Sequence, residues 1–238
     1  MIRVTSNLTM KWGILLAWLV ALISRAESNL TVDYRSQLSA LEAAYQTNEL
    51  NCEILFKLGH LCHQQGITGD ASAVKLAERY LTELKRLAPT NAFGQALLGS
   101  TIVMKARDAF LPTTKLKLVR QGCAEIDAAV RMSPADANVR FTRASNNLFL
   151  PDLCGRREIV KKDLEWLHEQ STQPMTRLAA DFRQYVALFY GLALQKWGDV
   201  SGAVAKWTAG ISIAAESAVA REIKAALKTL EKGASTPG

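Results

Sequence analysis

A helix-stopping motif that occurs twice constrains the fold of this chain more than any other sequence feature. Residues 86–91 read RLAPTN and residues 131–136 read RMSPAD, so each proline is followed two residues later by Asn or Asp. Proline stops a helix, and Asn or Asp caps the next one by accepting bonds from its first amides. Pro174 marks a third junction. The chain is therefore expected to fold as a series of short helical units.

Apolar residues recur at helical spacing along nearly the whole chain after residue 33. The stretches are 34–45, 54–62, 74–87, 92–107, 116–132, 139–148, 158–168, 175–197, 200–215 and 218–230. None of them alternates with the period of two that marks a strand. Helices this short bury little surface alone, so they must pack as antiparallel pairs. We predict an all-α fold, with a sizeable core because 49% of the residues are apolar.

The junctions divide the chain into four predicted helical hairpins, at about residues 53–89, 91–134, 137–174 and 175–216. The tripeptide Phe-Leu-Pro occurs inside two of them, at residues 110–112 and 149–151, so adjacent units share a turn design. We predict one helical repeat domain over residues 27–231. The last residues, 232–238, have little to bury and are expected to form a disordered tail.

Small residues in three of the hairpins follow the pattern of tetratricopeptide (TPR) repeats. In that family an apolar-glycine pair on the first helix faces a small residue on the second, with a large apolar residue four positions later. The matching residues are Leu58-Gly59, Ala77 and Leu81; Leu98-Gly99, Gly122 and Ile126; and Tyr190-Gly191, Ala203 and Trp207. Glycine or alanine at a crossing lets two helices approach closely, while the large residue fills the adjacent space. The third hairpin departs from the pattern, because Lys162 stands where a small residue is expected.

The chain thus resembles the TPR-like helical repeat superfamily over residues 53–216, as a divergent exported bacterial member. The resemblance implies hairpins stacked as a short TPR-like α-solenoid. Because the unit length varies, a compact irregular helical bundle is the alternative.

The first 26 residues have the composition of a secretory signal peptide. Lys11 precedes twelve apolar residues (12–23), and small residues surround the expected cleavage point after Ala26. A membrane span needs about 20 apolar residues, so retention as an anchor is the alternative. A chain whose translation started at Met10 would still carry a complete signal peptide, so Met10 is a second possible start. We expect an exported protein, periplasmic or extracellular, that meets a membrane only through this segment.

The charge of the chain gives little indication of a nucleic-acid partner. The formal net charge of +7 falls to +4 once Arg3, Lys11 and Arg25 are removed with the signal, since no acid precedes the cleavage point. No run of more than two consecutive basic residues follows, so we predict no nucleic-acid binding. Basic residues do begin two second helices, where the helix dipole disfavours them. They are Lys115, Lys117 and Arg120 after Pro112, and Arg156, Arg157, Lys161 and Lys162 after Pro151. Either a nearby anion or an ordinary basic surface would explain them.

Cys52, His60, Cys62 and His63 form the cluster that most resembles a metal site. His60 and His63 share a helix face, but the short Cys-x-x-Cys or His-x-x-x-His spacings of zinc sites are missing. We predict no metal and no cofactor, and retain His60, Cys62 and His63 as weak candidates. In an exported chain Cys123 and Cys154 are the pair whose disulfide is worth testing.

No catalytic motif is recognisable in the sequence. It has no Gly-x-Ser-x-Gly, no phosphate-binding glycine loop and no His-Glu-x-x-His, and only three histidines. Asp127, Asp163 and Glu165 lie among basic residues and are interpreted as solvated surface pairs. We predict that the chain has no catalytic residues and is not an enzyme.

Four polar residues of the third hairpin are candidates for binding a peptide. The first helices of TPR arrays line the concave groove, and the resemblance places Arg140, Arg143, Asn146 and Asn147 there. Arginine offers a two-pronged donor to a carboxylate, and amides add further donors. The predicted function is a non-enzymatic exported module that binds a protein or peptide segment in the bacterial cell envelope. The alternatives are a structural or accessory subunit of an envelope transport or assembly complex, and a metal-binding protein or enzyme that uses the cysteine–histidine cluster.

Overall fold

The computed structural model of the chain describes residues 27–234, with side chains described for residues 33–230. The predicted signal peptide and residues 235–238 lie outside this range. None of the helices described is long and apolar enough to cross a membrane.

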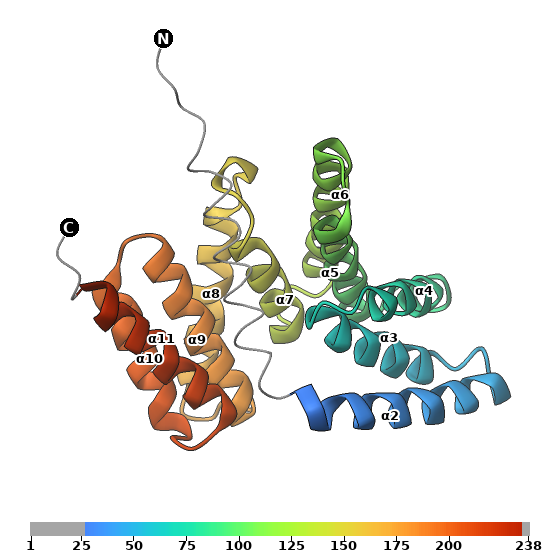
Figure 1. Cartoon of the computed structure of the whole chain (residues 1–238), viewed down its shortest axis with the longest axis horizontal. Helices are drawn as coiled ribbons and strands as arrows, with labels where there is room; N and C mark the ends of the chain where they lie inside the picture. Colours follow the sequence, from blue (N-terminus) through green and yellow to red (C-terminus); the bar gives the residue numbers. More distant parts are fainter. Residues whose placement is uncertain (1–26, 235–238) are drawn as a thin grey trace, which may run out of the picture. The chain divides into compact units, whose positions relative to one another are not determined.

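Ten α-helices and one short 3-10 helix, with no β-strand, make up residues 27–234 (Figure 1). They are α2 (Glu27–Thr47), α3 (Cys52–Ile67), α4 (Ala71–Leu87), α5 (Ala92–Asp108), α6 (Pro112–Met132), α7 (Ala137–Leu148), η1 (Asp152–Cys154), α8 (Arg157–Thr172), α9 (Ala180–Lys196), α10 (Val200–Ile213) and α11 (Ala218–Ala234). Each predicted hairpin contains two consecutive α-helices, and α11 continues three residues into the segment expected to be a tail. The all-α prediction is confirmed.

The described residues divide into two compact units, 27–125 and 126–234, with the boundary inside α6. In the first unit α3 packs against α2, α4 and α5; in the second α9 packs against α7, α8, α10 and α11. Each unit has its own core, built around Leu58 and Leu81 in the first and around Leu164 and Trp207 in the second. Late in α6, Glu125 accepts bonds from Lys85 and Gln95 of the first unit. The sequence does not show this division, because the apolar residues of α6 continue at helical spacing across the boundary.

Capping side chains fix the helix starts where the proline motifs predict them. The Asn91 carboxamide oxygen accepts from the amide of Gly94 at 2.8 Å. The Asp136 carboxylate accepts from Asn138 at 2.8 Å and Val139 at 3.2 Å. Such caps satisfy amides that the helix itself leaves free.

The small residues of the TPR-like pattern lie where helices cross. A Cβ added to Gly59 would stand 2.5 Å from Cδ2 of Leu81. One added to Gly122 would meet the carbonyl oxygen of Gly99, and one added to Gly191 would meet the indole of Trp207. The glycines therefore allow an approach that any side chain would block, as the sequence predicted.

Substituting these glycines should destabilise the chain by unequal amounts. Gly191→Ala forces a methyl group against the rigid, fully buried indole of Trp207 and should lower the free energy of unfolding by about 1–3 kcal/mol. Gly59→Ala places its methyl group against Cγ and Cδ2 of Leu81, a smaller side chain that can rotate away more easily than an indole, so it should cost less; both variants gain about the same helix propensity. Urea denaturation measures both. A Gly191→Ala chain as stable as Gly59→Ala would contradict the rigid crossing.

Candidate functional site

The third hairpin buries a carboxylate where the other hairpins have a small residue. Asp163 on α8 has no exposed side-chain surface, while Lys162 before it is exposed. Leu167, four residues after Asp163, is also fully buried. The pattern therefore continues one residue later than the sequence suggested, with Asp163 in the place of Ala77. The interpretation of Asp163 as a solvated surface residue was wrong, because it points into the hairpin.

The partner of this carboxylate replaces an apolar residue on the first helix. Arg143 is the seventh residue of α7, as Leu58 is of α3 and Leu98 of α5. An arginine–aspartate pair thus occupies the crossing that is apolar and small in the other hairpins.

Three arginines and two aspartates form a charge cluster that lies wholly in the second unit. Asp163 accepts from Arg140 Nη1 at 2.8 Å, from Arg143 Nε at 2.6 Å and from Arg143 Nη2 at 2.8 Å. Asp127 lies 3.5 Å from Arg143 Nη1 and accepts from Arg156 Nη2 at 2.7 Å. Arg140 also stacks over the ring of Trp166, at 4.6 Å. With three positive and two negative groups, the cluster has a formal charge of +1.

The position of Arg143 in the cluster favours its charged form. Burial opposes the charged form of Arg143, but its bonds to Asp163 and the charge of Asp127 raise its pKa above the ordinary value. A buried ion pair is strong only when its donors and acceptors are satisfied, as both oxygens of Asp163 are here.

The structure brings two of the predicted clamp residues together and assigns them a partner inside the protein. Arg140 and Arg143 both bind Asp163, so a peptide carboxylate would have to compete with a buried one. Asn146 donates to the carbonyl oxygen of Thr142 at 2.9 Å, and Asn147 is buried. The clamp remains a prediction.

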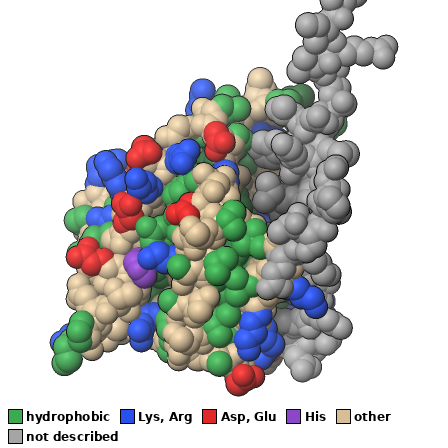
Figure 2. All heavy atoms as spheres, turned by 90° about the vertical axis from the view of Figure 1, so that its left-hand side faces the viewer, with side chains coloured by type: hydrophobic (Ala, Val, Ile, Leu, Met, Phe, Trp, Pro, Cys, Tyr) green, Lys and Arg blue, Asp and Glu red, His purple; other side chains and the backbone are tan. Residues whose placement is uncertain are grey.

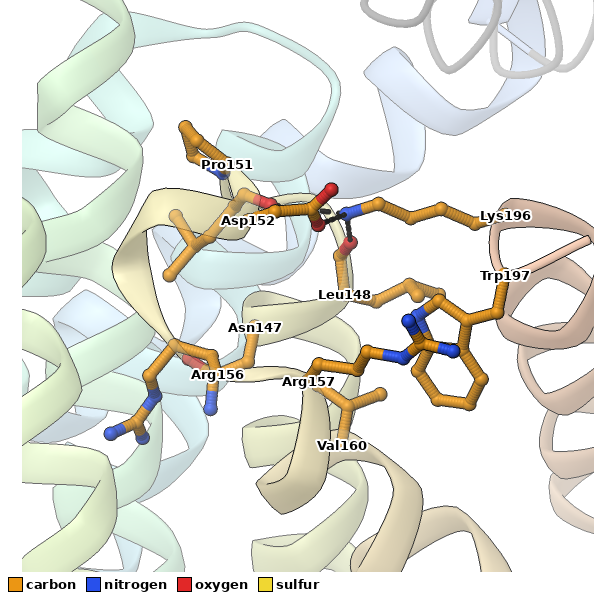
Figure 3. Close-up of a pocket in the computed structure, with 10 residues that line it drawn as sticks. Asn147, Leu148, Pro151, Asp152, Arg156, Arg157, Val160, Lys196 and Trp197 are labelled. Atoms are coloured by element: carbon orange, nitrogen blue, oxygen red, sulfur yellow. Dashed lines mark hydrogen bonds and ion pairs between the residues drawn. The ribbon is translucent and has the colours of Figure 1, made fainter.

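A small pocket lies at the start of α8, lined by residues of α7, α8 and α9 (Figure 3). Lys196 reaches across it and donates to the carbonyl oxygens of Leu148 at 2.9 Å and Leu150 at 3.1 Å, where α7 ends. Arg157 stacks on Trp197 at 5.2 Å. The remaining space, about 10 Å³, is that of a single water molecule. Lys196 therefore caps α7, and the pocket is structural.

The cysteine–histidine residues do not converge on one point. The Cys62 thiol is buried and accepts from the hydroxyl of Tyr34, and burial raises its pKa to about 11. His63 Nε2 lies 2.8 Å from the Ser100 hydroxyl, and His60 packs against aromatic rings. No group of three or more metal-ligating side chains gathers within the described part of the chain.

The disulfide predicted from the sequence would join Cys123 to Cys154. Cys154 has a free thiol and belongs to a different unit from Cys123. A bond between the two stays a prediction.

Aromatic side chains of first helices, and of the residue that ends α7, form two clusters. In the second unit Phe141 on α7 lies 5.3 Å from Phe182 and 5.1 Å from Phe189 on α9, and Phe149 lies 6.1 Å from Phe189. We call these four residues the aromatic row, and include Tyr185 because it lies three residues after Phe182 and four before Phe189 on the same helix. Phe149 and Tyr185 are 41% and 37% exposed, and the others are half-buried. The sequence does not single out these residues, because helical spacing alone does not separate a core face from a binding face.

The first unit has a smaller cluster of the same kind. Phe56 and His60 on α3 lie 5.6 Å and 5.8 Å from Phe93 on α5. All three side chains are half-buried. First helices in both units thus present aromatic rings that are only partly covered.

Other apolar side chains reach the surface of the second unit singly. Figure 2 shows the side that carries α10 and α11, where hydrophobic side chains are interspersed with basic and acidic ones. Val200 and Val204 on α10 are 49% and 39% exposed. Scattered apolar residues of this kind are normal for a protein surface.

Comparison with known proteins supports the fold. No protein-family model and no curated protein matches the sequence. Among solved structures, the chain is similar to the crystal structure of a thermophilic TPR protein from Thermus thermophilus, with a TM-score of 0.66. The match covers 91% of this chain and 98% of that one, at 17% identity. The chain has a TPR-like helical repeat fold, and the predicted solenoid class is confirmed.

Breaking the charge cluster should destabilise the third hairpin. Asp163→Ala leaves two arginines without their buried counter-ion and should lower the free energy of unfolding by roughly 3–5 kcal/mol. The double variant Arg143→Leu, Asp163→Ala restores the residue types of the first hairpin and should recover part of that loss. Urea denaturation measures both changes. An unfolding midpoint unchanged by Asp163→Ala would show that the cluster does not support the hairpin.

His63 should make stability depend on pH. Burial, followed by the charges of His60 and Arg107, lowers its pKa to about 3, while an unfolded histidine titrates near 6.5. Between these values the unfolded chain binds a proton that the folded chain excludes. The free energy of unfolding should therefore fall as pH drops from about 6.5, by at most about 1.4 kcal/mol per pH unit. His63→Gln should flatten this slope in urea titrations; an unaltered slope would exclude His63 as its source.

Proposed function

We propose that this chain is an exported, non-enzymatic protein that binds a protein or peptide segment in the bacterial cell envelope. The aromatic row is the observation that carries the proposal. Helical repeat folds present extended surfaces to their partners. Aromatic residues are also the side chains that most often dominate the free energy of such contacts.

The geometry of the aromatic row suits an extended or helical segment with apolar side chains. Ring centroids 5–6 Å apart leave edges and faces against which aliphatic or aromatic side chains can pack. Phe149 and Tyr185 are exposed enough to lose surface on binding, while the half-buried rings hold them in place. The Phe56, His60 and Phe93 cluster of the first unit would bind a separate segment.

The non-enzymatic part of the proposal is supported by the state of the polar groups in the core. Asp163 is bonded to two arginines, burial raises the pKa of Cys62 to about 11, and burial lowers the pKa of His63 to about 3. A catalytic acid, base or nucleophile needs access to its substrate, and these groups are enclosed. Arg140 and Arg143 would then support the groove from within.

Export is proposed from the composition of residues 1–26, which lie outside the described part of the chain. N-terminal sequencing of the protein recovered from the envelope fraction tests it, and a mature chain beginning at Glu27 is the expected result. An intact N-terminus with a membrane-bound chain would indicate a retained anchor instead.

The aromatic row can be tested with selected peptides. A displayed peptide library selected on the purified chain should return segments with two or three large apolar side chains. Phe149→Ser with Tyr185→Ser should weaken their binding about tenfold or more, because two exposed anchors are lost. Fluorescence anisotropy with a labelled peptide measures the change. Met175→Ser is the matched control, because Met175 is 90% exposed and lies outside the row.

Two results would favour another function. If the double variant binds the selected peptides as the parent does, the row is not the site. If the library returns nothing while the chain co-purifies with a defined multi-subunit assembly, the accessory-subunit role replaces the peptide-binding one.

A further inference from the structure

The turn between α5 and α6 carries the most exposed large apolar side chain in the described part of the chain. Phe110 is 94% exposed and Leu111 beside it is 55% exposed. Residues 111–117, which include the first turn and a half of α6, are all exposed. Leu116 adds a third apolar side chain, 38% exposed. The turn thus projects a small apolar tip from the first unit.

Basic residues that no described carboxylate neutralises lie directly behind this tip. Lys115, Lys117 and Arg120 form no ion pair with any acidic side chain among residues 33–230. Elsewhere in the same unit lysines are paired, Lys85 with Glu125 and Lys105 with Glu78. Only Asp108, just before the turn, opposes this positive charge in sequence.

The second Phe-Leu-Pro turn, between α7 and α8, serves as an internal comparison. Its cations are used inside the protein: Arg156 binds Asp127, and Arg157 stacks on Trp197. Lys196 holds the carbonyl oxygen of Leu150 within the turn itself. In the α5–α6 turn Lys115 donates to the carbonyl oxygen of Arg107 at 3.5 Å, but Lys115, Lys117 and Arg120 all remain exposed, as Phe110 and Leu111 are.

We propose that the α5–α6 turn binds the surface of an anionic phospholipid bilayer. Along a helix that rises 1.5 Å per residue, Lys115, Lys117 and Arg120 stand about 6, 9 and 14 Å behind Leu111. Apolar side chains of surface-bound helices enter the bilayer by about 5–10 Å, and lysines there reach back to the phosphates. The tip enters the headgroup boundary, and the cations bind the lipid phosphates.

The positive charge and the exposure of the turn disfavour two other binding partners. A second copy of the chain would bring the same positive charges together, and like charges repel. A folded protein partner usually receives an apolar anchor flanked by uncharged, buried contacts. Here the residues around the anchor are exposed cations.

Vesicle sedimentation tests the proposal with the purified chain. The vesicles contain about 30% phosphatidylglycerol in phosphatidylcholine. The lipid concentration is chosen so that half of the parent protein sediments with them. Phe110→Ser with Leu111→Ser should weaken binding about tenfold or more. Lys115→Gln with Lys117→Gln should weaken it about fivefold per lysine, and added salt should reduce the difference from the parent. Parent and variants are purified as the mature chain that begins at Glu27, so the differences between variants report the turn.

Matched controls come from the other turn and from the basic surface. Leu153→Ser removes an 83% exposed side chain of the α7–α8 turn, and Lys162→Gln removes an exposed cation. Neither should change vesicle binding by more than about twofold. Circular dichroism and urea denaturation check that the variants remain folded.

Three outcomes would overturn the proposal. One is equal binding of the parent to anionic vesicles and to pure phosphatidylcholine. A second is unchanged vesicle binding after the Phe110 and Leu111 substitutions in folded protein. The third is unchanged vesicle binding together with loss of a protein ligand, which would make the turn a protein contact.

Discussion

The close approach of paired helices at residues without side chains is the constraint on which the rest of the structure depends. At Gly59, Gly122 and Gly191 the backbone of one helix lies against the side chains or carbonyls of the next. Leu81 and Trp207 fill the adjacent space and are themselves fully buried. Each crossing has room for only one large side chain. It therefore sets both the distance between the two helices of its hairpin and their register.

The third hairpin meets the same constraint with charge. The carboxylate of Asp163 fits between the helices because two arginines surround it, and each of its oxygens accepts a bond. A shift of α8 by one residue would expose Asp163 and bury Lys162 in its place. The buried ammonium group of Lys162 would then have no carboxylate to pair with. The cluster therefore fixes the register of α8 on α7 through electrostatics, where the other hairpins rely on shape. This role accounts for the arginines without a ligand.

The helix positions and the glycine crossings could be predicted because proline, capping residues and small residues act locally. Asn91 and Asp136 cap the helices that follow them, as their spacing from proline requires. The role of Asp163 could not be predicted, because the same residue is a surface partner or a buried counter-ion depending on one residue of helix register. The aromatic row was missed for a related reason: Phe141, Phe182 and Phe189 come from two helices, and only their packing shows that the rings meet. The clamp of Arg140, Arg143, Asn146 and Asn147 had a sound chemical rationale, but a sequence does not show which donors are already engaged.

The continuity of α6 has a mechanical consequence. Glu125 is bonded to Lys85 and Gln95 of the first unit, and Asp127, two residues further on, is bonded to Arg156 of the second. Unwinding α6 at residues 125–127 would therefore release bonds that hold each unit together, so the last turns of one helix contribute to the stability of two separate cores.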